Sequence, residues 1–102
     1  MISMNDILTA KTVKKILGSK EIKLDSVTYK DLNNIMTRRN LELKTLSLKD
    51  WNKFKKDKEY KKLLSNLHEL YNLGYGSKFI SLCLSIKHKI FFSQHVIHKI
   101  IK

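Results

Sequence analysis

Lysine side chains are concentrated between residues 53 and 62, where six of them stand against two carboxylates. Ammonium groups at this density suit phosphate binding, because each contact with a polyanion releases a condensed counterion. A solvated helix face in a lysine-rich chain is the alternative explanation of the same run. Because the lysines gather where a helix is expected to begin, the sequence favours the phosphate-binding interpretation.

Groups suited to catalysis or to metal binding are not clustered in the sequence. The nine carboxylates are scattered and mostly lie beside lysines, whereas hydrolysis or group transfer needs grouped carboxylates or a base-activated nucleophile. A closed zinc site needs about four ligands at defined spacing, and the chain has no Cys-x-x-Cys pair. The remaining candidates are His68, His88, His95, His98 and Cys83. We therefore expect no enzymatic activity, no metal site, no cofactor and no small-molecule substrate.

The chain has 102 residues, a formal net charge of +12 and 42% apolar residues. One small hydrophobic core fits this length, so we expect a single domain over 1–102. Excess positive charge opposes folding by self-repulsion and indicates a partner of opposite charge, with nucleic acid the first candidate. We expect no signal peptide and no membrane partner. Because Cys83 has no second cysteine to pair with, we expect a cytoplasmic location.

The hydrophobic pattern predicts a mostly helical chain. The clearest helical spacing covers 58–73, with Gly74 as the stop. Residues 20–25 alternate weakly, as an extended segment does, and 77–92 indicates a hairpin with its tip at 87–89. A helix across 77–89 is the alternative, because its leucine and isoleucine spacing also fits a helix. The expected order is helix 5–17, helix 28–39, strand 41–46, helix 47–55, helix 58–73, hairpin 77–92 and helix 93–102.

Two further features accompany the element order over 28–92, namely a short turn and a leucine run that ends in glycine. They are Lys55-Lys56-Asp57 and Leu67…Leu70…Leu73-Gly74. With these features the chain resembles the winged helix-turn-helix superfamily, although the turn lacks the glycine common there. The resemblance implies an α+β, mostly helical fold with an extra N-terminal helix and a short C-terminal helix. An all-α helix-turn-helix bundle is the alternative.

The resemblance implies that helix 58–73 lies in the major groove of double-stranded DNA. Its polar side chains would contact base edges, lysines at the preceding turn would contact phosphates, and residues 87–89 would form the tip of the wing. The DNA-binding residues implied in this way are Lys53, Lys55, Lys56, Lys58, Lys61, Lys62, Ser65, Asn66, Lys87, His88 and Lys89.

In size, charge and lysine-rich composition, the chain is also similar to small DNA-binding accessory proteins of plasmids and phages, such as the relaxosome accessory proteins of conjugation. We therefore expect a sequence-preferring DNA-binding protein that acts in transfer, maintenance or transcription of a mobile element, within a larger nucleoprotein complex. The aliphatic segment 93–102 either closes the core or forms a dimer seam, and we expect a homodimer. Two other functions stay open: a protein-binding module such as a phage-encoded inhibitor, and a ribonucleoprotein component that binds structured RNA by shape.

Overall fold

The computed structural model describes residues 4–18, 20, 22 and 26–101, and this part of the chain is mostly helical. The described residues form no β-strand, and the one β-bridge among them pairs Lys44 with Ile90. The fold is therefore compatible with the all-α alternative, whereas the β part of the expected α+β winged fold is wrong. The helices are α1 (Met4–Leu17), α2 (Tyr29–Arg38), α3 (Leu48–Phe54), α4 (Lys58–Asn72), α5 (Ser77–His88) and α6 (Gln94–Ile101).

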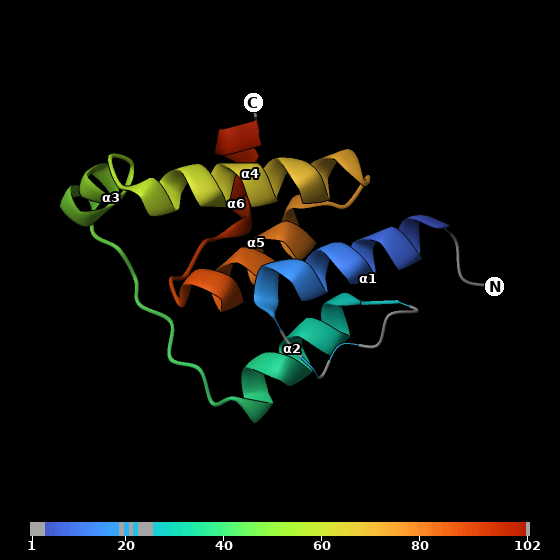
Figure 1. Cartoon of the computed structure of the whole chain (residues 1–102). Helices are drawn as coiled ribbons and strands as arrows, with labels where there is room; N and C mark the ends of the chain where they lie inside the picture. Colours follow the sequence, from blue (N-terminus) through green and yellow to red (C-terminus); the bar gives the residue numbers. More distant parts are fainter. Residues whose placement is uncertain (1–3, 19, 21, 23–25, 102) are drawn as a thin grey trace.

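Helix α5 lies at the centre of the fold. It occupies most of the segment 77–92, for which the sequence predicts a hairpin. Every residue from Phe79 to Ile86 is buried, and α1, α2, α4 and α6 all pack against this helix (Figure 1). A helix that is apolar on every side is stable only when neighbouring elements cover every side. The hairpin prediction for 77–92 is therefore wrong, and the alternative helix over 77–89 is confirmed. Residues 87–89 close α5, with Lys89 as its left-handed C-cap at a φ of 57°.

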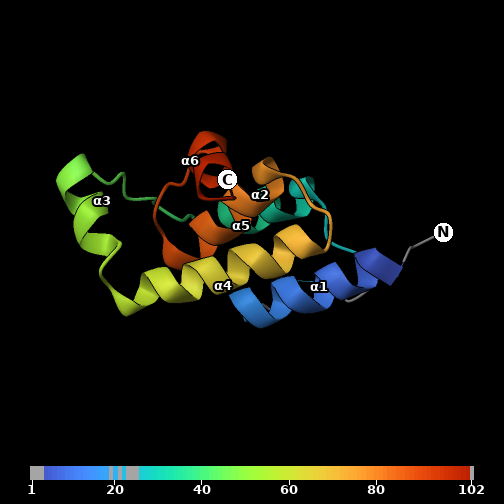
Figure 2. The same cartoon turned by 90° about the horizontal axis from the view of Figure 1, so that it is seen from above.

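Helices α1 and α4 lie side by side, and both pack on α5 (Figure 2). Helix α2 lies on the other side of α5 from α4 (Figure 1). The core between these layers consists of aliphatic side chains at helical spacing, which explains why the amphipathic helices settle with these faces inward. The fully buried members include Ala10, Val13, Leu32, Leu63, Leu67, Leu70, Ile80, Leu84 and Ile97.

Four helices begin at a residue whose side chain caps the first turn. At the start of α2 the Thr28 N–H donates to the Asp31 carboxylate at 2.8 Å, and the Asp31 N–H donates to the Thr28 hydroxyl at 3.2 Å. Side-chain oxygens of Ser47, Asp57 and Ser93 accept backbone N–H groups at the starts of α3, α4 and α6. Each bond satisfies an N–H that the first turn leaves free. The five predicted helices outside 77–92 are thus confirmed, with ends that differ by at most one residue.

The expected strand 41–46 is an extended connection instead. The Lys44 N–H donates to the Lys89 carbonyl at 3.0 Å, and the Phe91 N–H donates to the Lys44 carbonyl at 2.8 Å. These two bonds make a single bridge, because the hairpin that would have supplied a neighbouring strand is a helix. The extended segment expected at 20–25 lies mostly outside the described residues. None of the described helices has the length and apolar content needed to cross a membrane.

Candidate nucleic-acid interface

The turn between α3 and α4 carries the lysines that the sequence singles out. Lys53 lies in the last turn of α3, Lys55 and Lys56 form the turn, and Lys58 and Lys61 follow in the first turns of α4; all five are exposed. Two backbone hydrogen bonds hold the turn. The Lys56 N–H donates to the Lys53 carbonyl at 3.1 Å, and the Asp57 N–H donates to the Phe54 carbonyl at 2.9 Å. Figure 1 shows that α3 and the start of α4 lie at one end of the molecule. The local fold therefore places five exposed lysines on this end.

Lys58 occupies a position that opposes helix stability, because it is the first residue of α4. The N-terminus of a helix carries a partial positive charge, and a cation there costs about 0.3–1 kcal/mol at low salt. The nearby carboxylates are already engaged, since Asp57 accepts the Glu59 N–H at 3.1 Å and Glu59 lies 3.5 Å from the Lys62 ammonium. The exposed lysines that surround this position suit the binding of a polyanion.

A second basic region lies where α1, α4 and the end of α5 meet. Lys15 of α1, Lys62 of α4 and Lys87 of α5 border an open hollow of about 320 Å³. Asn66 and Glu69 line the same hollow, and the Lys15 ammonium lies 3.7 Å from the Glu69 carboxylate. Sequence reasoning missed Lys15, because only the packing of α1 beside α4 places it there. Its one signal in the sequence was its position opposite the apolar face of helix 5–17.

The structure brings most of the predicted site residues into these two regions. Lys62, Ser65, Asn66 and Lys87 line the hollow, whereas Lys53, Lys55, Lys56, Lys58 and Lys61 lie at the turn and the start of α4. Ser65 is exposed but Asn66 is half-buried, so α1 leaves only part of the predicted reading face open. Lys89 is exposed at the end of α5.

His88 does not lie at the tip of a wing. Its side chain is only 3% exposed, and its Nδ1 lies 3.3 Å from Glu59 Oε2. The rings of Phe54 and Phe92 lie 6.4 and 6.1 Å from the imidazole. Burial lowers the pKa of His88 below its ordinary value, although the Glu59 carboxylate partly offsets this effect. The Nε2 atom is buried and has no hydrogen-bond partner among the described residues, so His88 contributes to packing between α4 and α5.

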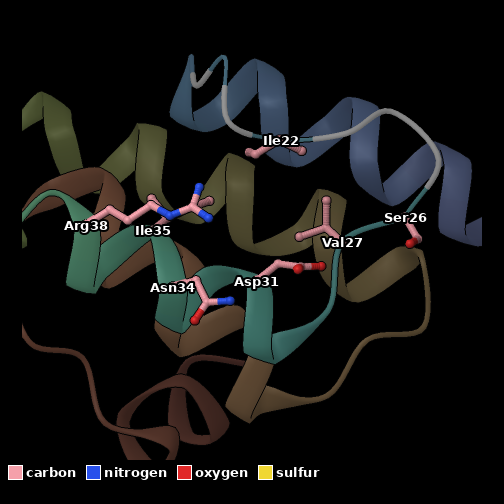
Figure 3. A pocket seen from close by; sticks show the side chains of 7 residues that line it. All are labelled: Ile22, Ser26, Val27, Asp31, Asn34, Ile35 and Arg38. Carbon is pink, nitrogen blue, oxygen red and sulfur yellow. The ribbon is translucent and has the colours of Figure 1, made fainter.

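The described residues offer no assembled metal-binding set. Figure 3 shows a pocket of about 390 Å³ beside α2, with Asp31, Asn34 and Arg38 on its wall. The Asp31 carboxylate accepts the N–H and the hydroxyl of Thr28 at 2.8 and 3.0 Å, so it serves the helix cap. Burial raises the pKa of the Cys83 thiol to about 12, which keeps it protonated and unreactive. The described part of the chain has no group of three or more metal-ligating side chains.

The two lysine-rich regions lie on neighbouring elements. Their carboxylates are Asp57 and Glu59 at the start of α4 and Glu69 beside the hollow. These regions present ammonium groups to solvent around α4, which also carries the exposed hydroxyl of Ser65. Comparison of the chain with protein-family models, with curated proteins and with solved structures finds no match.

Proposed function

We propose that this chain is a non-enzymatic protein that binds double-stranded DNA with a sequence preference, as an accessory or regulatory protein of a plasmid or phage would. The observation that carries the proposal is the group of exposed lysines around the start of α4, where Lys58 opposes helix stability. A duplex offers a regular row of phosphates that such a group can neutralise, with release of counterions.

In the binding mode that we propose, the N-terminal half of α4 enters the major groove, which is wide enough for one helix. Lys58, Lys61 and Ser65 point away from the core and would face the DNA. Lys56 in the turn would contact the backbone on one side. Because α1 flanks the other side of α4, Lys15 would reach the phosphates there.

The test compares binding to a selected site and to a random duplex of about 30 base pairs, both measured by fluorescence anisotropy at several salt concentrations. The site comes from selection of bound duplexes from a random pool. Lys56→Ala should weaken binding to both duplexes by a similar factor. Ser65→Ala and Asn66→Ala should instead reduce discrimination between them by about 1–3 kcal/mol.

Lys30→Ala is the matched control, because Lys30 is an exposed lysine in the first turn of α2, on the far side of α5. The absence of binding at micromolar protein would refute the proposal. Equal losses from Lys30→Ala and Lys56→Ala would refute the assigned surface, since they would reflect net charge alone. Competition with duplex RNA of the same length tests the ribonucleoprotein alternative, which tighter RNA binding would favour.

A further inference from the structure

A second open surface lies between α3, α4 and α6, away from the outward lysines of α4. We name it the α3–α6 groove. It encloses about 740 Å³, and its apolar walls come from Leu48 and Trp51 of α3, Leu64 of α4, and Val96 and Ile100 of α6. Each of these side chains is left partly or largely exposed by the fold.

The apolar surface of the groove is continuous and has no partner within the described chain. None of the seven described residues of α3 is buried, and Leu48 is 77% exposed. Trp51 and Val96 also line an adjoining hollow of about 220 Å³, beside which Phe91 is 52% exposed. Single exposed apolar residues are ordinary, but a contiguous patch with a polar rim is typical of a site of protein interaction.

The rim of the groove carries positive charge. Lys55 and Lys99 stand on it together with His68 and Asn52, and no carboxylate is among the described residues that line it. A partner that covers this patch must therefore bring carboxylates beside its apolar side chains. A second copy of this chain carries a net charge of +12, so the positive rim would repel it.

The walls also fit a peptide better than unpaired nucleic-acid bases. Base stacking needs a free aromatic face, but the Trp51 ring stacks with Phe54 at 5.8 Å and has the Lys55 ammonium over it at 5.6 Å. The edge of Tyr60 meets the same ring at 6.0 Å. The surfaces that remain open are largely aliphatic, and these accept leucine or isoleucine side chains.

We propose that the α3–α6 groove binds an acidic amphipathic helix of a partner protein. Aliphatic side chains one turn apart along that helix would fill the groove, and the carboxylates on its flanks would meet Lys55 and Lys99. This inference does not depend on the proposed DNA-binding function. Of the two lysines on the rim, Lys99 lies outside the proposed DNA surface, and Leu48 takes no part in that surface.

The probe is a fluorescent helical peptide of about 18 residues, with leucines at i, i+4, i+7 and i+11 and glutamates on both flanks. One control peptide has alanine in place of every leucine, and the other has lysine in place of every glutamate. The full chain should bind the probe at micromolar concentration and each control at least about tenfold more weakly. Equal binding of all three peptides, or no binding of the probe at all, would overturn the proposal.

The protein variants locate the binding site. Leu48→Ser and Lys99→Glu should each weaken probe binding about tenfold while leaving the helical circular dichroism and duplex binding unchanged. Met4→Ser is the matched apolar control, because Met4 is 78% exposed on α1, and Lys30→Glu is the matched charge control. Probe binding that survives Leu48→Ser, or that falls equally in the control variants, overturns the assignment to this groove.

Two further outcomes would identify a different occupant. Sedimentation that shows a dimer, converted to monomer by Leu48→Ser, would give the groove to a second copy of the chain. A single-stranded oligonucleotide that displaces the probe and quenches Trp51 fluorescence would give it to nucleic acid. Either result overturns the proposal that an acidic helix binds in the groove. If the natural chain binds duplex DNA but does not bind the probe, this inference alone is refuted. If it binds the probe but not duplex DNA, only the DNA proposal is refuted.

Discussion

Replacing Lys58 by glutamate should stabilise the fold and weaken DNA binding at the same time. Lys58 is the first residue of α4 and is exposed. The substitution removes an unfavourable cation from the positive end of the helix and adds a favourable anion, each worth about 0.3–1 kcal/mol at low salt. The new carboxylate also gains Lys61 and Lys62 at i+3 and i+4, worth about 0.3–0.5 kcal/mol for a pair. The sum is a gain of about 1–2.5 kcal/mol, or roughly 4–20 °C in Tm.

The effect on DNA has the opposite sign. If the six lysines of 53–62 contact phosphates, log affinity should fall with log salt at a slope near −5, which is about a thousandfold loss between 50 and 200 mM. Removing one contact should lower the magnitude of that slope by about 1, on specific and random duplexes alike. Lys58→Glu should therefore be more stable than the natural chain and bind more weakly.

Lys30→Glu is the control that separates the two effects. Lys30 is the second residue of α2, so this change has the same charge difference and the same favourable position at a helix start. It should raise the free energy of unfolding, measured by urea at low salt, without changing the salt slope of DNA binding. A Lys58→Glu variant that is no more stable, or a Lys30→Glu variant that loses as much affinity, would refute the reasoning about this surface.

Three further predictions concern α5 and its contacts. Burial lowers the pKa of His88 below 6.5, so the unfolded chain takes up a proton first as pH falls. The free energy of unfolding should therefore drop as pH falls through 6.5, and urea titrations should show a flatter profile for His88→Phe. Ser85→Ala removes the buried hydroxyl that accepts the Phe92 N–H at 3.0 Å, which should cost about 1–3 kcal/mol in urea unfolding. Cys83, with its pKa raised to about 12, should resist a thiol reagent in the native protein and react at the rate of unfolding, so rapid native labelling would contradict its burial.

Most of the helices could be predicted because their apolar residues follow one face. In α4 the buried side chains Leu63, Leu67 and Leu70 recur at helical spacing, and Asp57 marks the start through its side-chain bond. Helix α5 lacks such a pattern, because all the residues from Phe79 to Ile86 are buried. When four other helices cover one helix, its sequence loses the periodicity on which prediction depends, and its aromatic and β-branched residues then resemble those of a strand.

Part of the candidate site could likewise be predicted from the sequence, and part depends on how the helices pack. The lysines of 53–61 are close in sequence and exposed, so the sequence alone places them together. Lys15 joins Lys62 only through the packing of α1 against α4. His88 is turned inward because the end of α5 meets the first turn of α4, where Glu59 lies 3.3 Å from the imidazole. These relations between distant segments are properties of the packed helices rather than of any local pattern.

Helix α4 joins the two surfaces that we propose. Its leucines face the core, its outward lysines form the DNA surface, and Leu64 with Tyr60 faces the α3–α6 groove. Lys55 borders both surfaces, since it stands at the turn before α4 and on the rim of the groove. One ammonium group cannot neutralise a phosphate and a partner's carboxylate at full strength, so each ligand should weaken the other by the same factor. An acidic partner in the groove would thus lower the affinity for DNA by engaging Lys55, without occupying the face of α4 that contacts the bases.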